Sequence, residues 1–296
     1  MYSITNDLLK VQVKAKGAEL CRITSVKNNT EFMWNADPDI WGNHAPNLFP
    51  VIGELKNNAL LYDKEYYKMT KHGFIRNNDD IVLINNTANS LSFELVYNEK
   101  TLSIYPFKFK FAITFTLVDN NIEVKHTVEN IDNKALYFSL GGHPAFNCPV
   151  FDNENYHDYY LEFEQIENSS RHLINLSNGL ISSKTRQVFN NSNILPLSHD
   201  MFNEDALIFK NLKSRKVSLK NINIGEVLSV SFNDFNYLGI WAKPNANFVC
   251  IEPWLGLADH EDTNQKLEEK EGIIKLDVGN TFSASYKIAI NGKLLN

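Results

Sequence analysis

Three segments of the 296-residue chain place a titratable side chain among glycine, proline and aromatic residues, where an ordinary strand would alternate apolar and polar residues. They are KHGFIRN at residues 71–77, SLGGHPAFN at residues 139–147 and FVCIEPWLGLAD at residues 248–259. Histidine titrates near neutral pH, and a carboxyl group can exchange a proton once its pKa is raised. The chemistry that these segments offer is therefore proton transfer.

The histidine of the second segment, His143, follows two glycines and precedes Pro144. Glycine allows a sharp turn or a close approach to a ligand, and proline fixes the backbone just after the histidine. His143 is thus a candidate proton donor at the end of a strand. For this segment alone, a structural histidine bonded to a turn carbonyl is an equal alternative. For the isolated His72-Gly73-Phe74 of the first segment, a solvated loop is the better interpretation.

The carboxylate of the third segment, Glu252, follows an apolar strand and precedes Pro253 and Trp254. Burial beside the indole would raise the pKa of this carboxyl toward the range of a general acid or base. A buried ion pair with Arg76 or a lysine is the structural alternative. An aromatic ring can also stack on the apolar face of a pyranose while polar groups bind its hydroxyls, which makes Trp254 a candidate sugar platform.

Other chemistries have no local support in the sequence. Phosphate-binding G-x-x-x-x-G-K-[ST], dinucleotide-binding G-x-G-x-x-G after a strand, nucleophilic G-x-S-x-G and zinc-binding H-E-x-x-H motifs are absent. The cysteines, Cys21, Cys148 and Cys250, lack zinc spacing, and their odd number fits a reducing compartment better than a disulfide framework. Cys250 is expected to be a small buried residue and not a nucleophile. No role is expected for the other histidines, which are His44, His126, His157, His172, His199 and His260.

Charge and hydropathy exclude further classes of protein. The chain has 29 Lys and Arg against 35 Asp and Glu, a formal charge of −6, which gives no electrostatic reason to bind nucleic acid or anionic lipid. No segment approaches the ~20 apolar residues of a membrane span, and the N-terminus lacks the pattern of a secretory signal. With 43% apolar residues the chain can bury a sizeable core. We expect a soluble, cytosolic protein.

The elements that would position the three segments are strands, because apolar and polar residues alternate with period two along most of the chain. Strands are predicted at residues 9–13, 92–97, 105–118, 122–128, 135–140, 159–163, 217–220, 227–232, 237–242, 248–251 and 284–290. A tight turn is expected at residues 119–121, a short surface helix at residues 262–271 and another turn within residues 193–206. No alternation of strands with helices, no internal repeat and no domain boundary is visible. The sequence therefore predicts an all-β protein, one large antiparallel β-sandwich over residues 1–296.

In their order and spacing, the three segments resemble those of the aldose 1-epimerase (galactose mutarotase-like) family, and above all its bacterial LacX-like branch. NLFPVIG at residues 47–53 and DALIF at residues 205–209 extend the resemblance over most of the chain. The resemblance implies a β-sandwich with a sugar cleft on one concave sheet. It also implies an isomerase that interconverts the α and β anomers of a free aldohexose and needs no cofactor or metal.

By position, Glu252 resembles the family's general base, which takes the proton of the anomeric hydroxyl. His143 resembles the general acid, which protonates the ring oxygen from the opposite side so that the C1–O5 bond breaks. His72 resembles the second histidine, which binds the ring oxygen or a neighbouring hydroxyl. Arg76 and Asp205 resemble substrate-contacting residues.

One position departs from the family pattern. The family's LFP-x-x-G segment is typically followed by an arginine that contacts sugar hydroxyls, and Glu54 stands there in this chain. Lys56 or Arg76 would have to compensate, so the identity of the sugar stays open. A hexose-phosphate mutarotase would need a basic cluster for the phosphate, and no convincing one is visible in the sequence.

Two alternatives come from other classes of protein. One is a non-catalytic sugar-binding or regulatory protein on the same fold. The other is a glycoside hydrolase or lyase, which would need a second catalytic carboxylate from Asp205 or Asp259. The presence of Glu252, His143 and His72 together favours the isomerase, because a binding protein needs no proton relay. The expected partner is a small sugar, without nucleic acid or membrane, and the protein is expected to be a monomer or homodimer.

Overall fold

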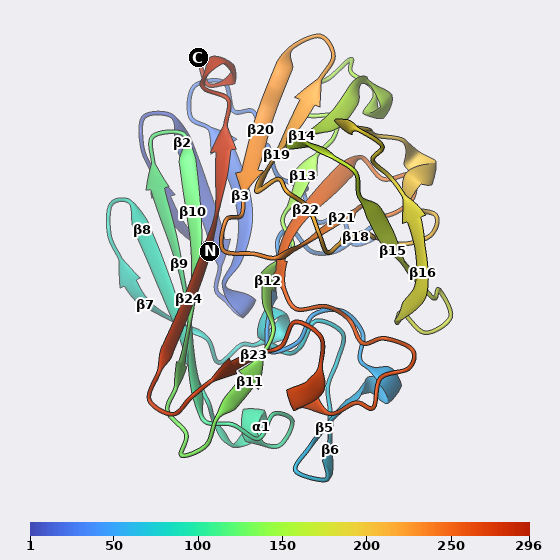
Figure 1. The fold of residues 1–296 in the computed structure, drawn as a ribbon. Helices are drawn as coiled ribbons and strands as arrows, with labels where there is room; N and C mark the ends of the chain where they lie inside the picture. The colour runs from blue at the N-terminus through green and yellow to red at the C-terminus, as the bar shows by residue number, and fades with distance from the viewer.

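Two large antiparallel sheets form most of the structure, a computed structural model that describes residues 1–296 (Figure 1). The nine-stranded sheet has the order β17 (Ser192–Pro196), β14 (Tyr159–Glu167), β19 (Lys216–Asn221), β20 (Gly225–Ser231), β24 (Thr281–Ile290), β10 (Asn121–Asn130), β9 (Phe109–Val118), β8 (Ser90–Val96) and β7 (Val82–Asn86). The eight-stranded sheet has the order β16 (Ile181–Gln187), β15 (Ser170–Ile174), β18 (Leu207–Phe209), β21 (Tyr237–Trp241), β22 (Phe248–Leu255), β12 (Leu140–Gly142) and β4 (Asn47–Leu48), and β13 (Ala145–Asn147) also pairs with β22. The predicted all-β antiparallel sandwich is confirmed.

Smaller elements complete the chain. The small sheets are β1 (Tyr2–Thr5) with β2 (Leu9–Lys14) and β3 (Glu19–Ser25), β5 (Ala59–Tyr62) with β6 (Glu65–Lys68), and β11 (Leu136–Phe138) with β23 (Ile274–Leu276). The single α-helix is α1 (Glu99–Leu102). The 3-10 turns are η1 (Lys16–Ala18), η2 (Lys56–Asn58), η3 (Ile75–Asn77), η4 (Tyr156–Asp158), η5 (His199–Phe202), η6 (Leu267–Glu269) and η7 (Gly292–Leu294). A bilayer could not be crossed by any of these helices, which are too short for it.

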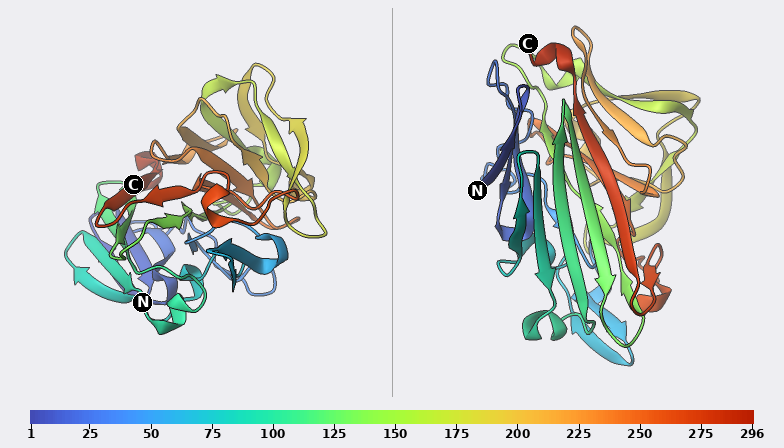
Figure 2. Two further views of the ribbon diagram at one scale, coloured as in Figure 1. Left: turned by 60° about the horizontal axis from the view of Figure 1, so that its bottom comes forward. Right: turned by 90° about the vertical axis from the view of Figure 1, so that its left-hand side faces the viewer.

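The β9–β10 hairpin shows why alternation identified the strands. Buried residues recur at every second position of both strands, and the pairing runs from Val118 opposite Asn121 to Phe109 opposite Asn130. The turn expected at residues 119–121 is present, and Asp119 has a φ of 52°, which aspartate tolerates better than most residues. In the right-hand view of Figure 2 the red β24 runs beside this green hairpin.

Two sequence predictions are wrong in detail. The strand predicted from residue 105 begins only at Phe109, because Pro106 has no N–H to donate to a ladder. The surface helix predicted over residues 262–271 is absent, and only η6 turns there. Tertiary contacts override its helical composition: Gln265 accepts a hydrogen bond from the backbone of Leu61, and Lys270 is buried against Asp259.

The apolar interior has two parts. One contiguous cluster, rich in phenylalanine, fills the space between the sheets. A smaller cluster lies on the eight-stranded sheet around Trp254, and consists of Leu48, Ile52, Ile181, Ala206, Ile208, Trp254, Leu257 and Ala258. Several of its members also line a cavity, so this smaller cluster holds the walls of the candidate site in place.

Candidate active site

Glu252 lies in the middle of the eight-stranded sheet, on β22, opposite Gly239 of β21. Its side chain is only 1% exposed. Because side chains alternate along a strand, Cys250, Glu252 and Trp254 emerge on the same face of β22. A Cβ at Gly239 would lie 2.6 Å from the Trp254 ring, so glycine is required there for the indole to lie against the neighbouring strand. The backbone of β21 thereby fixes the ring next to the carboxylate.

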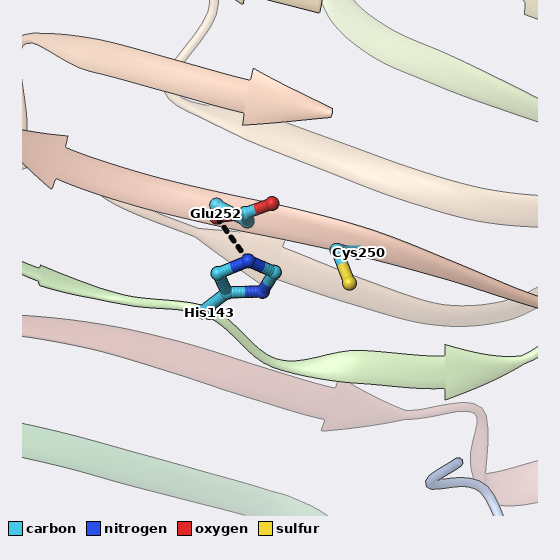
Figure 3. Close-up of side chains that lie close together, drawn as sticks. All are labelled: His143, Cys250 and Glu252. Atoms are coloured by element: carbon cyan, nitrogen blue, oxygen red, sulfur yellow. Dashed lines mark ion pairs between the residues drawn. The ribbon is translucent and has the colours of Figure 1, made fainter. Parts of the chain in front are cut away.

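His143 reaches the same point from the segment between β12 and β13. Its backbone N–H donates to the carbonyl oxygen of Pro46, and its ring Nε2 lies 3.2 Å from Oε2 of Glu252 (Figure 3). The ring is buried, and its Nδ1 has no hydrogen-bond partner. Oε2 of Glu252 has no hydrogen bond either and has only the His143 ring nitrogen beside it. The structure thus brings the two predicted proton-transfer groups into direct contact.

His72 is held by a reciprocal pair of contacts with Gly53. The His72 N–H donates to the Gly53 carbonyl oxygen at 3.0 Å, and the Gly53 N–H donates to His72 Nδ1 at 3.1 Å. Because Nδ1 accepts a hydrogen bond, the proton of the neutral ring is on Nε2. The rings of His72 and His143 are 5.6 Å apart, edge to face. His72 is therefore a neutral hydrogen-bond donor beside the pair.

Burial sets the protonation of these groups. It raises the pKa of Glu252 well above the usual range of a carboxyl, with Lys71 opposing the shift and Asp205 adding to it. Burial also lowers the pKa of His143 to about 3 and that of His72 well below its ordinary value. A buried pair resists net charge of either sign, so Glu252 and His143 together hold one proton at neutral pH.

A cavity of ≈ 290 Å³ opens over the pair, a volume suited to one small ligand. All six predicted site residues line it: His72, Arg76, His143, Asp205, Glu252 and Trp254. Asp205, with a φ of 64°, accepts a hydrogen bond from the Ala206 N–H, and Nε of Arg76 has no partner. Open donors and acceptors around a small cavity suit a polyhydroxylated ligand.

The Glu54 departure affects this cavity directly, because Glu54 lines it. Of the two residues proposed to compensate, Arg76 also lines the cavity. The ammonium of Lys56 instead donates to the carbonyl oxygens of Glu261 and Thr263, and Lys56 is not part of the lining. Of these two residues, only Arg76 therefore lies at the cavity.

Two further tryptophans, Trp41 and Trp241, complete the site, and no motif singled them out. The Trp41 ring stacks on the His143 ring at 5.0 Å and 28°, and Trp241 meets the same ring edge to face at 5.7 Å. Both line the cavity, as does Lys243. Trp34 donates from Nε1 to the carbonyl oxygen of Trp41 and so anchors the loop that carries it. No local motif marks Trp41, because tertiary contacts and not the neighbouring sequence place its loop beside His143.

The second carboxylate that a hydrolase would need is not supplied by Asp259. Its Oδ1 accepts a hydrogen bond from the buried Lys270 ammonium at 2.5 Å, and its Oδ2 accepts one from the Lys56 N–H. Both oxygens are occupied, and Asp259 does not line the cavity. Asp205 does line it and remains the other candidate.

One group of potential metal ligands also occurs here. Ligand atoms of His143, Cys250 and Glu252 all lie within 4.8 Å of one another. The three cysteines are free and buried. Spacing in the sequence could not reveal this group, because β13 and β22 bring its members together from distant positions.

The sequence matches the aldose 1-epimerase family over residues 1–272. The chain belongs to this family. Within the aldose 1-epimerases and their relatives, the chromosomal protein LacX of Lactococcus lactis subsp. lactis is 34% identical over 295 residues, which cover 97% of this chain and 98% of LacX. The resemblance seen in the three segments is thus confirmed.

Solved structures agree with this membership of the aldose 1-epimerase family. A galactose mutarotase related enzyme from Lactobacillus acidophilus has a TM-score of 0.92 and 36% identity, covering 98% of this chain and 97% of that one. A galactose mutarotase-like protein from Lactobacillus casei ATCC 334 has a TM-score of 0.90 and 29% identity, covering 98% and 100%. The fold is therefore galactose mutarotase-like over nearly the whole chain.

Proposed function

We propose that this protein is a cofactor-independent mutarotase that opens and recloses the ring of a hexose by general acid–base catalysis. The observation that carries the proposal is the contact between Glu252 and His143 beneath a cavity. Both groups are buried, and each has a polar atom without a partner. A buried carboxyl oxygen without a hydrogen bond is costly to a fold, so its retention beside a histidine points to function.

The reaction uses the single proton that the pair holds. In the reactive form Glu252 is a carboxylate and His143 an imidazolium. Glu252 takes the proton of the anomeric hydroxyl while His143 delivers its proton to the ring oxygen, and the C1–O5 bond breaks to give the aldehyde. Glu252 is then a neutral carboxylic acid and His143 a neutral imidazole, which are the forms that burial favours. After rotation about C1–C2 the ring closes with the roles reversed, and no water or nucleophile is consumed.

The geometry changes one detail of the expected mechanism. The anomeric and ring oxygens are both bonded to C1, so they are neighbours. Groups only 3.2 Å apart can therefore serve both oxygens from one side of the sugar, and need not lie on opposite sides. His72 would donate from Nε2 to the ring oxygen or an adjacent hydroxyl, with Arg76 and Asp205 binding other hydroxyls. Trp254 would pack against the sugar ring.

We further propose that the protein acts in the cytoplasm as one domain over residues 1–296, as a monomer or homodimer. Three free, buried cysteines fit a reducing compartment. The candidate site draws on segments from residue 72 to residue 252, which favours one folding unit. Sugar is the proposed partner, and no nucleic acid or membrane is.

A second candidate substrate class has its own supporting observation. Lys71, Arg76 and Lys243 all line the cavity, and none of them forms an ion pair. Three cations on one cavity support a basic cluster of the kind that a phosphate needs, with Lys71 and Arg76 from the KHGFIRN segment and Lys243 from a distant one. A hexose phosphate would place its anionic group among these cations.

The test follows the anomeric equilibration of freshly dissolved α-glucose, α-galactose and a hexose phosphate by NMR or polarimetry at neutral pH. We expect acceleration by the wild-type protein, with kcat reduced about 10²–10⁴-fold in Glu252→Gln and in His143→Asn. His157→Asn, at an exposed histidine outside the cavity, is the matched control and should keep full activity. Sugar binding by calorimetry without acceleration of any substrate would overturn the proposal in favour of a binding protein.

The pH dependence provides a second readout. Activity requires the one-proton form of the Glu252–His143 pair, so the rate should fall when the pair gains a second proton and when it loses its only one. Burial opposes both charged forms, since it raises the pKa of Glu252 and lowers that of His143. We expect a bell-shaped plot of rate against pH, with a broad plateau around neutral pH. A rate that stays flat from acid to alkaline pH would count against the pair.

A further inference from the structure

The Cys250 thiol lies close to the two proton-transfer groups, although only those two line the cavity. We propose that His143, Cys250 and Glu252 form a binding site for a thiophilic divalent cation such as Zn²⁺, and that the bound cation inhibits the protein. Nothing in the sequence spacing of these residues indicates such a site. It arises because β13 and β22 pair, and it is visible in Figure 3.

The separation of the ligand atoms suits one ion. All three lie within 4.8 Å of one another, so a point exists that is at most about 2.8 Å from each of them. Zinc bonds to nitrogen, oxygen and sulfur are about 2.0–2.3 Å long. Each side chain therefore has to move by less than about 1 Å to bind the ion, a shift that does not require the strands to separate.

The ligand atoms are also free to bind. Nδ1 of His143 and Oε2 of Glu252 are buried and without a hydrogen-bond partner, and the Cys250 thiol is free. All three side chains are more than nine-tenths buried. Elsewhere in the molecule buried polar atoms are usually paired, so two such atoms without a hydrogen bond beside a free thiol mark a place that a ligand would stabilise.

The donor set selects the kind of cation. One nitrogen, one sulfur and one oxygen suit Zn²⁺, whereas Mg²⁺ and Ca²⁺ prefer oxygen alone. On binding, the thiol and the carboxyl each release a proton, and the two resulting negative charges balance the charge of the ion. The buried site then carries no net charge. Three protein ligands leave the fourth position of a tetrahedral ion open. Two of the three, His143 and Glu252, line the cavity, through which the ion can enter.

Inhibition follows from the identity of the ligands. An ion held by His143 and Glu252 removes both the acid and the base that the proposed mutarotase reaction requires. Cys250, in contrast, does not line the cavity and has no part in that reaction. Its replacement should therefore abolish metal sensitivity while the reaction itself continues, which separates the two roles of the site.

The decisive experiment measures metal binding without reference to activity. Co²⁺ is titrated into the purified, metal-free protein, and thiolate-to-cobalt charge transfer is followed by absorption, with Zn²⁺ then added as a competitor. We expect one Co²⁺ per chain with a charge-transfer band that Zn²⁺ removes. In Cys250→Ala and in the near-isosteric Cys250→Ser the band should vanish, and affinity should fall by more than the ~10–100-fold that loss of an outer partner costs.

Two matched controls locate the ion. Cys21→Ala removes another free, buried cysteine. His157 and His199 form an accessible pair of histidines whose ring centroids are 5.6 Å apart, and they are the surface site that could bind Co²⁺ instead. His199→Ala removes one member of this pair. Both variants should keep the band and the affinity. A wild-type protein without the band, or a band that survives in both Cys250 variants, would overturn the proposal.

Activity gives an independent second arm. Micromolar Zn²⁺ should inhibit wild-type mutarotation, a chelator should restore it, and Cys250→Ser should be resistant while keeping its basal rate. If the protein catalyses no mutarotation at all, the proposed function fails while the cobalt spectra still decide the metal site. If Zn²⁺ binds at Cys250 without inhibiting an active protein, the inhibitory half of the proposal is wrong.

Discussion

Glu252 and Glu167 are equally buried carboxylates in very different surroundings. Each residue is about 1% exposed. Oε1 of Glu167 accepts hydrogen bonds from the Lys213 N–H, the Ser214 N–H and the Ser214 hydroxyl, at 2.7–3.0 Å. Oε2 of Glu252 has no hydrogen bond and faces a neutral histidine. The first carboxylate holds Lys213 and Ser214 against the end of β14. The second has no such hydrogen bonds at Oε2 and lies beside a cavity.

The other buried carboxylates follow Glu167. Glu19 accepts the backbone N–H groups of His44 and Ala45 and pairs with Lys14. Asp259, only seven residues after Glu252, is bonded through both oxygens. Burial alone therefore does not identify a functional carboxylate in this molecule. What distinguishes Glu252 is that its buried Oε2 accepts no hydrogen bond and has only the His143 ring beside it.

The largest expected effect comes from exchanging the two glutamates for glutamine. Glu252→Gln should lower kcat about 10²–10⁴-fold, while the free energy of unfolding changes less than in Glu167→Gln, because Oε2 of Glu252 accepts no backbone hydrogen bond and contacts only His143. Glu167→Gln should keep its activity but lose roughly 1–3 kcal/mol of stability, because the amide group cannot accept all of the same hydrogen bonds. Mutarotation assays and urea unfolding on both variants provide the comparison. Equal losses of stability would erase the distinction between the two carboxylates.

The Asp259–Lys270 pair tests the stabilising role of a buried carboxylate whose oxygens are both bonded. Lys270→Met leaves a buried aspartate without its cation and should destabilise the protein by about 3–5 kcal/mol in urea unfolding. Lys266→Met, which breaks the exposed pair with Glu269, should cost no more than about 1 kcal/mol. Adding Asp259→Asn to Lys270→Met should recover part of the loss. A Lys270→Met variant as stable as Lys266→Met would show that the buried pair contributes nothing.

Buried histidine extends the comparison to pH. His126 is fully buried, donates from Nε2 to Oδ1 of Asn47, and has its pKa lowered by burial to about 3. An unfolded histidine has a pKa of about 6.5, so the unfolded chain binds the proton more readily. The contribution of neutral, buried His126 to the free energy of unfolding is therefore present in full above about pH 6.5. It falls by about 1.4 kcal/mol per pH unit as the pH drops toward 3.

His126→Gln isolates this contribution, because the amide can still donate to Asn47 but does not titrate. Its unfolding free energy between pH 6.5 and pH 4 should fall less steeply than that of the wild type, by about 1.4 kcal/mol per unit. His143 and His72 are also buried, so part of the slope should remain. The measured quantity is the slope of the unfolding free energy against pH, which does not depend on how stable the variant is at neutral pH. Parallel curves would mean that His126 is protonated in the folded protein.

The strands and the main site residues were predictable because their signals are local. Alternation located β9 and β10, and three short segments contain five of the six residues that line the cavity as predicted. The approach of Cys250 to within 4.8 Å of His143 was not predictable, because it depends on how β13 pairs with β22. The helix predicted over residues 262–271 failed for the same reason, since buried Lys270 and its partner hold that segment in another conformation. Local periodicity cannot encode contacts between distant strands and loops.

Glu54 offers the smallest and most specific test, because it is a carboxylate on the same cavity that is neither fully buried nor bonded within the protein. It shares the lining with Lys71, Arg76 and Lys243. Glu54→Gln removes a negative charge from this group of cations, so an anionic substrate should benefit and a neutral sugar should not. Partly exposed charges interact by about 0.2–1 kcal/mol, which predicts a rise of at most about fivefold in kcat/KM for a hexose phosphate relative to glucose.

Salt separates this electrostatic effect from a change in shape. The gain for the phosphate should shrink as ionic strength increases, because exposed charges are screened. Glu65→Gln, at an exposed glutamate outside the cavity, should leave the substrate ratio unchanged. If Glu54→Gln instead lowers kcat/KM for glucose and leaves the phosphate unaffected, Glu54 binds a hydroxyl in place of the family arginine. The neutral hexose would then be the substrate for which this cavity is built.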